Sequence, residues 1–146
     1  MTSSSSPYCK AHYKIMVKVS SSEDSLRHGG EMGTLWFKMR GNDSHSEKIP
    51  FSTEPVFFEP GKNFTFMTVG ENVGHVMNAT MSYTFKSNPL NPLTWRIFTP
   101  KVFVDYVIIE SMENNSKIKL CPSHDMPVVQ NENIVFREES CAYRKH

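Results

Sequence analysis

The residues best suited to chemistry are dispersed along the chain rather than gathered in motifs. No G-x-S-x-G elbow occurs to place a nucleophilic serine on a strained turn. Cys9 has no obvious partner base, which a catalytic thiol needs. The glycines of "HGGEMG" precede a strand-like segment rather than a helix, which indicates a hairpin connection and not a phosphate cradle. We therefore expect no catalysis within this chain.

The histidines and the most unusual carboxylate show no metal-binding pattern. No H-x-x-x-H pair would set two imidazoles on one helix face, since the histidines are His12, His28, His45, His75, His124 and His146. Asp105 lies in an otherwise apolar run. It is either a tuned acid or, more simply, a carboxylate at an edge or domain boundary with a basic or hydroxyl partner. We expect no metal ion and no cofactor.

Four N-x-S/T motifs favour a secreted protein. They are Asn42 (NDS), Asn63 (NFT), Asn78 (NAT) and Asn114 (NNS). The start of the chain, "MTSSSSP", has no apolar segment of the kind found in a signal peptide. Either a signal lies upstream in a longer chain, or the protein stays inside the cell. The sequons favour the first alternative.

Three cysteines leave two alternatives open. Cys121 and Cys141 could close a loop while Cys9 is left over, which suits an oxidising compartment. The other alternative is three reduced thiols in a cytosolic protein.

An apolar segment between turn signals is the strongest candidate for binding. In "KSNPLNPLTWRIFTPK" the candidate residues are Leu90, Leu93, Trp95, Arg96, Ile97 and Phe98. They either fill the core from a loop folded back over the domain or contact a lipid interface. Tryptophan suits the boundary between water and acyl chains, and Arg96 and Lys101 could meet lipid phosphates.

Composition narrows the class of protein. The 146 residues suit one domain, and 16 basic residues against 15 acidic ones give a formal charge of +1. That balance excludes the basic footprint of a nucleic-acid-binding domain. No apolar run is long enough to span a bilayer.

Alternation of apolar and polar residues with a period of two recurs, whereas helical periodicity is nearly absent. The expected inward-facing set is Tyr13, Ile15, Val17, Val19, Leu35, Phe37, Met39, Phe64, Phe66, Met77, Ala79, Met81, Tyr83 and Phe85. Asn63 and Asn78 fall on the polar faces of their strands, where sugars would not disturb a core. "VFVDYVIIE" is apolar on both faces and predicts a central strand. The pattern predicts an all-β, antiparallel sandwich of about eight strands.

Three segments together resemble a known family: "PYCKAHYKIMVKV", "KNFTFMTVGENVGHVMNATMSYTF" and the closing "KLCP…FREESC". They are similar to the C-terminal polycystin–lipoxygenase–alpha-toxin (PLAT) β-sandwich of secreted lipases such as pancreatic, lipoprotein and hepatic lipase. The opening "PYC…HY" is similar to the branch containing phosphatidylserine-specific phospholipase and lipase member H. The resemblance places a linker or tail at 1–8, the PLAT domain at 9–141 and a C-terminal tail at 142–146.

The resemblance implies a function for the whole protein. It implies a Cys121–Cys141 disulfide, and a separate upstream hydrolase domain holding a Ser–His–Asp triad. In lipoprotein lipase a tryptophan-rich loop at the place of the Trp95 segment touches lipid particles, although this chain has one tryptophan there instead of a cluster. In pancreatic lipase the module docks a protein, colipase. We therefore expect a non-catalytic domain of a secreted triglyceride lipase or phospholipase that positions the hydrolase on lipid. The alternative is a protein-interaction module that docks a colipase-like protein or a receptor without touching lipid.

Overall fold

The computed structural model describes residues 10–20, 32–42, 44–51, 56–85, 101–122, 127–129 and 133–142. The strands in these ranges are β1 (Lys10–Val19), β2 (Met32–Gly41), β3 (Ile49–Pro50), β4 (Val56–Phe57), β5 (Asn63–Glu71), β6 (Val76–Phe85), β7 (Lys101–Ser111), β8 (Ser116–Pro122), β9 (Pro127–Val129) and β10 (Ile134–Arg137). One short helix, α3 (Glu138–Ala142), follows β10. The helix was not predicted, but the all-β, antiparallel architecture is confirmed.

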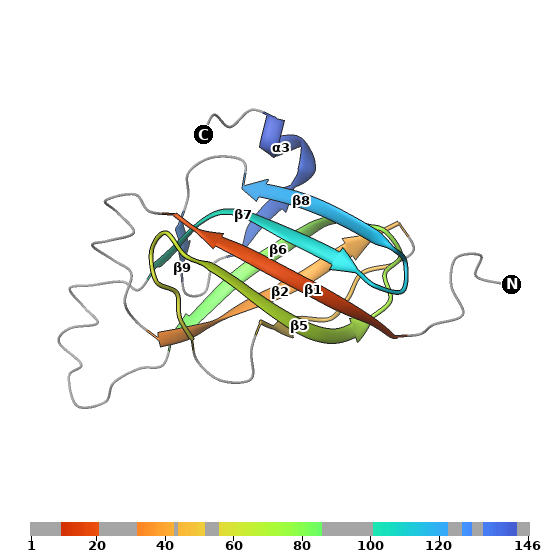
Figure 1. The fold of residues 1–146 in the computed structure, drawn as a ribbon, viewed down its shortest axis with the longest axis horizontal. Coiled ribbons are helices and arrows are strands. Elements are labelled where there is room, and N and C mark those ends of the chain that lie inside the picture. Colours follow the sequence, from red (N-terminus) through yellow and green to blue (C-terminus); the bar gives the residue numbers. More distant parts are fainter. Residues whose placement is uncertain are drawn as a thin grey trace, which may run out of the picture.

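Two layers of strands pack face to face (Figure 1). One layer is β5-β1-β7-β8, and the other contains β2, β6 and β10 with the short β3 and β4 attached to β2. The layers join at one edge, where β10 pairs with β8. β7 pairs with β1 on one side and with β8 and β9 on the other, which confirms that "VFVDYVIIE" is a central strand.

The core lies between the layers and follows the period-two pattern. In β1 the side chains of Tyr13, Ile15, Val17 and Val19 are at most 1% exposed, and their neighbours along the strand face outward. Leu35, Phe37 and Met39 on β2 and Ala79, Met81 and Tyr83 on β6 are buried in the same way. Phe64 and Phe66 are partly buried at the rim of this core. The Phe64 ring makes an edge-on contact with Phe58, and the Phe66 ring makes one with Phe51.

Two β-bulges change which side chains face inward. Between β2 and β6 the pairing moves from Arg40↔Asn78 to Gly41↔Val76, so Met77 is the extra residue. Val76 therefore turns inward (5% exposed) and Met77 outward (55% exposed). The prediction that Met77 shares the inward face of β6 is wrong for this reason.

A matching bulge occurs on β7. The pairing with β1 moves from Lys18↔Tyr106 to Val19↔Val104, which leaves Asp105 as the extra residue. Asp105 is only partly exposed and makes an interaction with a neighbouring group. Both expectations for this carboxylate stay predictions.

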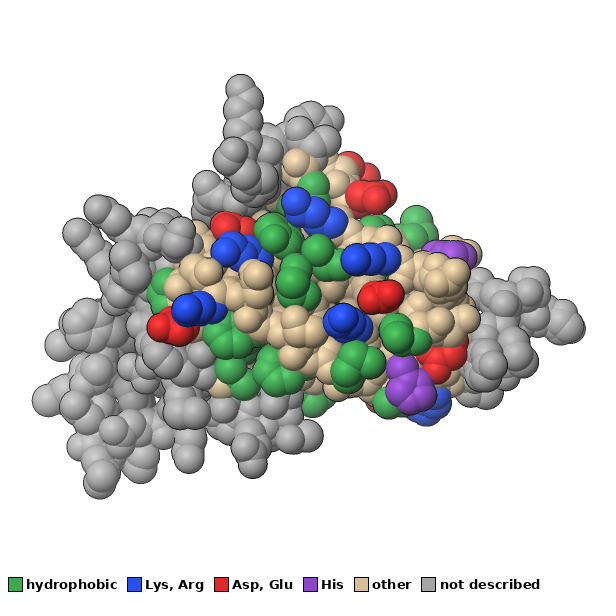
Figure 2. All heavy atoms as spheres, in the orientation of Figure 1, with side chains coloured by type: hydrophobic (Ala, Val, Ile, Leu, Met, Phe, Trp, Pro, Cys, Tyr) green, Lys and Arg blue, Asp and Glu red, His purple; other side chains and the backbone are tan. Residues whose placement is uncertain are grey.

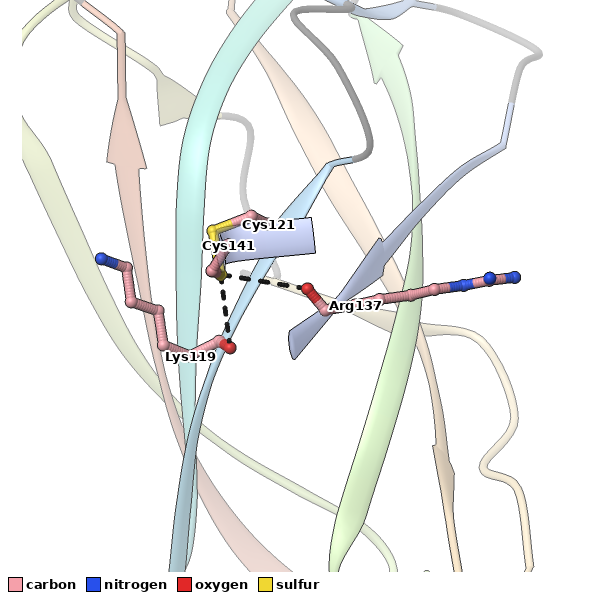
Figure 3. The surroundings of a disulfide bond; sticks show 4 residues. All are labelled: Lys119, Cys121, Arg137 and Cys141. Atoms are coloured by element: carbon pink, nitrogen blue, oxygen red, sulfur yellow. Dashed lines mark hydrogen bonds between the residues drawn. A yellow bond between two sulfur atoms is a disulfide. The ribbon is translucent and has the colours of Figure 1, made fainter. Parts of the chain in front are cut away.

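A disulfide fastens α3 to the edge where the layers join (Figure 3). Cys121 on β8 is bonded to Cys141 on α3, with the two Cα atoms 5.0 Å apart. Cys121 also pairs with Arg137 of β10. The Cys141 sulfur lies 3.6 Å from the Lys119 carbonyl oxygen and packs against both strands. This is the pairing that the family resemblance implied.

The opposite end of the sandwich is held together by side chains that contact the β5–β6 turn. The Tyr13 hydroxyl donates to the Glu71 carbonyl (2.6 Å) and accepts from the Val73 N–H (3.2 Å). Burial is the largest influence on this phenol and raises its pKa above 10.0. From the β7–β8 turn, Asn114 Nδ2 donates to Asn72 Oδ1, at 2.7 Å. The β5–β6 turn is therefore tied to both neighbouring segments.

Candidate functional site

The predicted lipid-binding residues Leu90, Leu93, Trp95, Arg96, Ile97 and Phe98 lie outside the described residues, as does Cys9. The expectations for these residues, for the linker at 1–8 and for the tail at 142–146 stay predictions.

The four sequon asparagines differ in their surroundings, and Asn63 and Asn78 lie on the outward sides of their strands, as predicted. Asn42 and Asn63 are exposed, and Asn78 is partly buried on the outer side of β6. Asn114 differs, because its Nδ2, the atom to which a glycan would be attached, donates to Asn72 Oδ1, the Gly74 carbonyl and Ser111 Oγ. A sugar on Asn114 would compete with these bonds. Glycosylation at all four positions stays a prediction.

The outer side of β5-β1-β7-β8 carries the most distinctive surface among the described residues. We call it the lysine-framed face. Its apolar residues are Met16, Met67, Val69, Tyr106 and Ile108, and its lysines are Lys10, Lys14, Lys18, Lys117 and Lys119. The acidic residues at outward positions of these four strands are Glu71, Glu110 and the bulge residue Asp105. Figure 2 shows this side of the molecule, with hydrophobic side chains along its middle interspersed with Lys or Arg side chains.

The strand register brings these residues together from distant parts of the sequence. Met16 lies beside Thr65 on one side and Ile108 on the other, and Ile108 lies beside Lys119. One row along the strands, Met67, Lys14, Glu110 and Lys117 are neighbours. A hollow of about 180 Å³ opens between these rows.

The most exposed apolar residues of this face are open to solvent, and two of its lysines contact neighbouring groups. Met67 and Val69 are 58% and 54% exposed, although a soluble domain normally keeps such side chains covered or scattered. The Lys119 ammonium lies 4.3 Å from the centre of the Tyr106 ring, and Lys18 Nζ donates to the Gly61 carbonyl. Lys10, Lys14 and Lys117 are exposed. The face thus offers apolar contact area together with positive charge.

At one end of the face a His–Glu pair ties the β7–β8 turn to β1. Glu113 accepts a hydrogen bond from the His12 backbone N–H (2.6 Å), and its other oxygen lies 2.6 Å from His12 Nδ1. The side-chain bond to His12 and then the backbone bond hold the pKa of the Glu113 carboxyl below its usual value of 4.5.

The outer side of β2, β6 and β10 differs in shape and composition. We call it the polar groove. It contains hollows of about 630 and 710 Å³ that share Lys38, His45 and Thr80. Trp36 forms part of its wall, with its indole N–H donating to Thr84 Oγ1 (2.8 Å) and Lys48 above its ring. The sequon residues Asn42 and Asn78 both line the groove.

The described residues offer binding surfaces rather than reaction chemistry. Among them, no group of three or more His, Cys, Asp or Glu side chains is placed to hold a metal ion. No helix in the described ranges is long and apolar enough to cross a membrane. What the lysine-framed face supplies is the pairing of exposed apolar side chains with cations, which suits a surface that is apolar and negatively charged.

The alternation in the sequence indicates that Lys14 and Lys18 face away from the core. Ordinary solvated lysines do the same, so this pattern alone does not identify a binding surface. The signal that could have revealed the site is Met16 between these two lysines, together with the uncharged Thr65, Met67 and Val69 at outer positions of β5. These residues form one surface only because of the register between the strands, and the register cannot be seen in the sequence.

The arrangement of the strands is that of a PLAT-type, C2-like β-sandwich. No family model matches the chain, and no curated protein matches it in sequence. Solved lipoxygenase structures do match it. A LOX in complex with arachidonate matches 87% of this chain with a TM-score of 0.64, and coral 8R-lipoxygenase matches 87% with 0.65. A calcium-dependent 11R-lipoxygenase matches 88% with 0.63, and each of the three is 18% identical.

At this identity the likeness establishes the fold alone. The chain covers only 16–17% of the length of these lipoxygenases. The coral structure is reported to show calcium activation through a C2-like domain, and the other enzyme is described as calcium-dependent. The described residues of this chain lack the carboxylate cluster on which a calcium site would be built.

Proposed function

We propose that this chain is a non-catalytic domain that attaches a secreted triglyceride lipase or phospholipase to lipid, and that the lysine-framed face contacts the lipid surface. A separate Ser–His–Asp hydrolase domain would perform the reaction. The lipase context and secretion rest on the sequence resemblance and the sequons. The observation that carries lipid attachment is the exposure of Met67 and Val69 on the same outer side as five lysines.

The energetics favour weak, reversible attachment. A lysine close to an anionic leaflet contributes about 1 kcal/mol, and this contribution falls off within a Debye length of roughly 10 Å. Methionine and valine add apolar area at about 25 cal/mol per Å² removed from water. Because the Tyr106 ring and the Gly61 carbonyl already engage Lys119 and Lys18, we expect the exposed Lys10, Lys14 and Lys117 to be the most available to lipid.

The Trp95 segment is proposed as a second lipid contact. Its combination of tryptophan, aliphatic residues and Arg96 suits the region of lipid headgroups. This part of the proposal rests on the sequence alone.

A protein-binding role is the second candidate, and one feature of the face favours it. Met16 and Met67 place two soft, adaptable side chains on the same side of the layer, and such methionines suit varied protein surfaces. The partner would be a colipase-like protein, a receptor or the hydrolase domain itself.

Vesicle sedimentation with a matched pair of charge reversals tests the proposal. Lys117→Glu with Lys119→Glu changes the lysine-framed face, and Lys38→Glu with Lys48→Glu makes the same change of charge at the polar groove. Each pair contains one lysine stacked on an aromatic ring, Lys119 on Tyr106 and Lys48 on Trp36. At low salt, binding to vesicles containing phosphatidylserine should fall by roughly thirtyfold or more in the first variant, because each reversal replaces an attraction of about 1 kcal/mol by a repulsion.

The control variant should keep most of its binding, since its reversed charges lie on the other side of the sandwich. Equal losses in both variants would show that net charge alone attracts the chain to lipid. A wild-type chain that ignores these vesicles but captures a purified protein partner through the same lysines would favour the second candidate.

A further inference from the structure

β5 forms one edge of its layer. It pairs with β1, and no other strand in the described ranges pairs with it. The strand is nine residues long, "NFTFMTVGE", with no proline and with Glu71 at its end as its one charged residue. Its register with β1 runs from Lys18↔Asn63 to Lys10↔Glu71 without a shift. β5 is thus a long and regular edge.

Edges of this kind are usually protected, because their unpaired N–H and C=O groups invite another strand. The far end of the strand order shows such protection. There β3 is only two residues long and ends in Pro50, and a proline cannot donate to a further strand. β5 has no bulge, no internal charge and no proline.

Both sides of the β5 edge are also apolar. Met67 and Val69 point outward and are more than half exposed. On the inner side, Phe64 and Phe66 keep part of their surface exposed even though they contact Phe58 and Phe51. A strand added here would cover apolar side chains as well as complete a hydrogen-bonded ladder.

We propose that β5 pairs antiparallel with β5 of a second copy of this chain, about a two-fold axis at Met67. The sequence of the strand is complementary to itself in this register. On the outer side Thr65 meets Val69 of the second copy, and the two Met67 residues meet each other. On the inner side Phe64 meets Gly70 and Phe66 meets Thr68, so that each ring faces a small residue. No like charges face each other along the ladder, which is the condition for favourable cross-strand pairs.

The pairing joins two four-stranded layers into one sheet. Its strand order is β8-β7-β1-β5 followed by the same strands in reverse. Neighbouring strands of a sheet keep their outer sides together, so the two lysine-framed faces become adjacent. Two weak contacts on one rigid body bind a surface more tightly than either alone. The dimer itself does not depend on lipid binding, and its test uses no lipid.

Sedimentation velocity of the 146-residue chain over a range of concentrations tests the pairing. The wild-type chain should pass from monomer to dimer as concentration rises. Met67→Lys and Met67→Glu should each remain monomeric at concentrations at which the wild type dimerises, a loss of about tenfold or more in affinity, because like charges meet at the axis. An equimolar mixture of the two variants should regain the dimer, because opposite charges then meet.

Met77→Lys is the matched control. Met77 is 55% exposed, close to the 58% of Met67, but lies at the bulge of β6 in the other layer. This variant should dimerise like the wild type. Circular dichroism confirms that each variant is folded, and Thr65→Lys, at another exposed position of β5, serves as a second disrupting variant if Met67→Lys is not folded.

Several outcomes would overturn the inference. They are a wild-type chain that is monomeric up to roughly 1 mM, a dimer that survives both Met67→Lys and Thr65→Lys, a mixture that stays monomeric, and assemblies larger than a dimer. A chain that is monomeric alone but binds an extended peptide along β5 would also reject a second copy as the occupant of the edge.

Discussion

The two outer sides of the sandwich differ although both are built on the same alternating pattern. The lysine-framed face contains a hollow of about 180 Å³, and it exposes Met67 and Val69. The polar groove has hollows of about 630 and 710 Å³ and a wall containing Trp36, whose N–H is engaged by Thr84. The groove also contains two sequon asparagines, while the face has Asn63 at the end of its edge strand.

This contrast shows that the fold requires buried apolar side chains at the inward strand positions but leaves the side chains at the outward positions free to vary. Tyr13 and Phe37 sit in equivalent inward positions of the two layers, and both are fully buried. Along its strand Tyr13 lies between the outward His12 and Lys14, whereas Phe37 lies between the outward Trp36 and Lys38. A side with exposed apolar and cationic residues suits contact with a lipid surface, whereas a groove bearing two of the glycosylation motifs suits solvent. Variants at the contacts that hold the sandwich together test this comparison.

The largest effect is expected from removing the disulfide where the layers join. Cys121→Ser with Cys141→Ser opens a cross-link between residues 20 positions apart and should lower the free energy of unfolding by about 3 kcal/mol. Urea denaturation of the variant and the wild type measures this. Lys117 and Lys119 lie on β8 but are not part of the cross-link. Binding of the folded variant to anionic vesicles, measured well below its melting temperature, should therefore be unchanged. If lipid preference changes while the chain remains folded, the two sides are not independent.

A smaller loss is expected at the turn that leads from β5 in one layer to β6 in the other. Tyr13→Phe leaves the buried Val73 N–H without its acceptor and the Glu71 carbonyl without its donor, which should cost about 1–3 kcal/mol. The pKa of Tyr13 is raised, so the contribution of its neutral hydroxyl is complete below pH 10.0 and is lost as the pH rises through the folded-state value. Urea denaturation at neutral and alkaline pH measures both effects. An equally stable Tyr13→Phe variant at neutral pH would contradict this role.

The smallest effect concerns the His12–Glu113 pair at the end of the lysine-framed face. The folded state lowers the pKa of Glu113, so its stabilising contribution is present above the usual value of 4.5 and is lost as the pH falls through the folded-state value. The difference in stability between the wild type and Glu113→Gln should therefore exist at neutral pH and disappear in acid. Glu110→Gln on the neighbouring β7 serves as the control. A difference that is independent of pH would show that the carboxylate charge plays no part.

The sequence predicted the inward pattern well, because burial imposes a period of two that needs no knowledge of partners. Ile15, Leu35 and Met81 are buried as expected. Met77 could not be placed correctly, since its bulge depends on how β6 is paired with β2. The helix carrying Cys141 was missed because its five residues are too short for helical periodicity to show.

The candidate surface was harder to predict than the core. The alternation of Lys14, Met16 and Lys18 was visible, but the contact of Met16 with Ile108 joins positions far apart in the sequence. That β5 is an edge follows only from the strand order. Alternation identifies which side of a strand faces outward, and only the register shows which outward residues form one surface.

Quenching of tryptophan fluorescence by brominated lipids tests the central claim most directly, because it reports which side of the sandwich meets the acyl chains. With Trp36→Phe and Trp95→Phe in place, Ile108→Trp puts the sole tryptophan on the lysine-framed face. With Trp95→Phe alone, Trp36 reports from the polar groove. On vesicles containing phosphatidylserine, the probe at position 108 should be quenched and Trp36 should not. Quenching of Trp36 with an unaffected probe at position 108 would contradict lipid contact through the lysine-framed face.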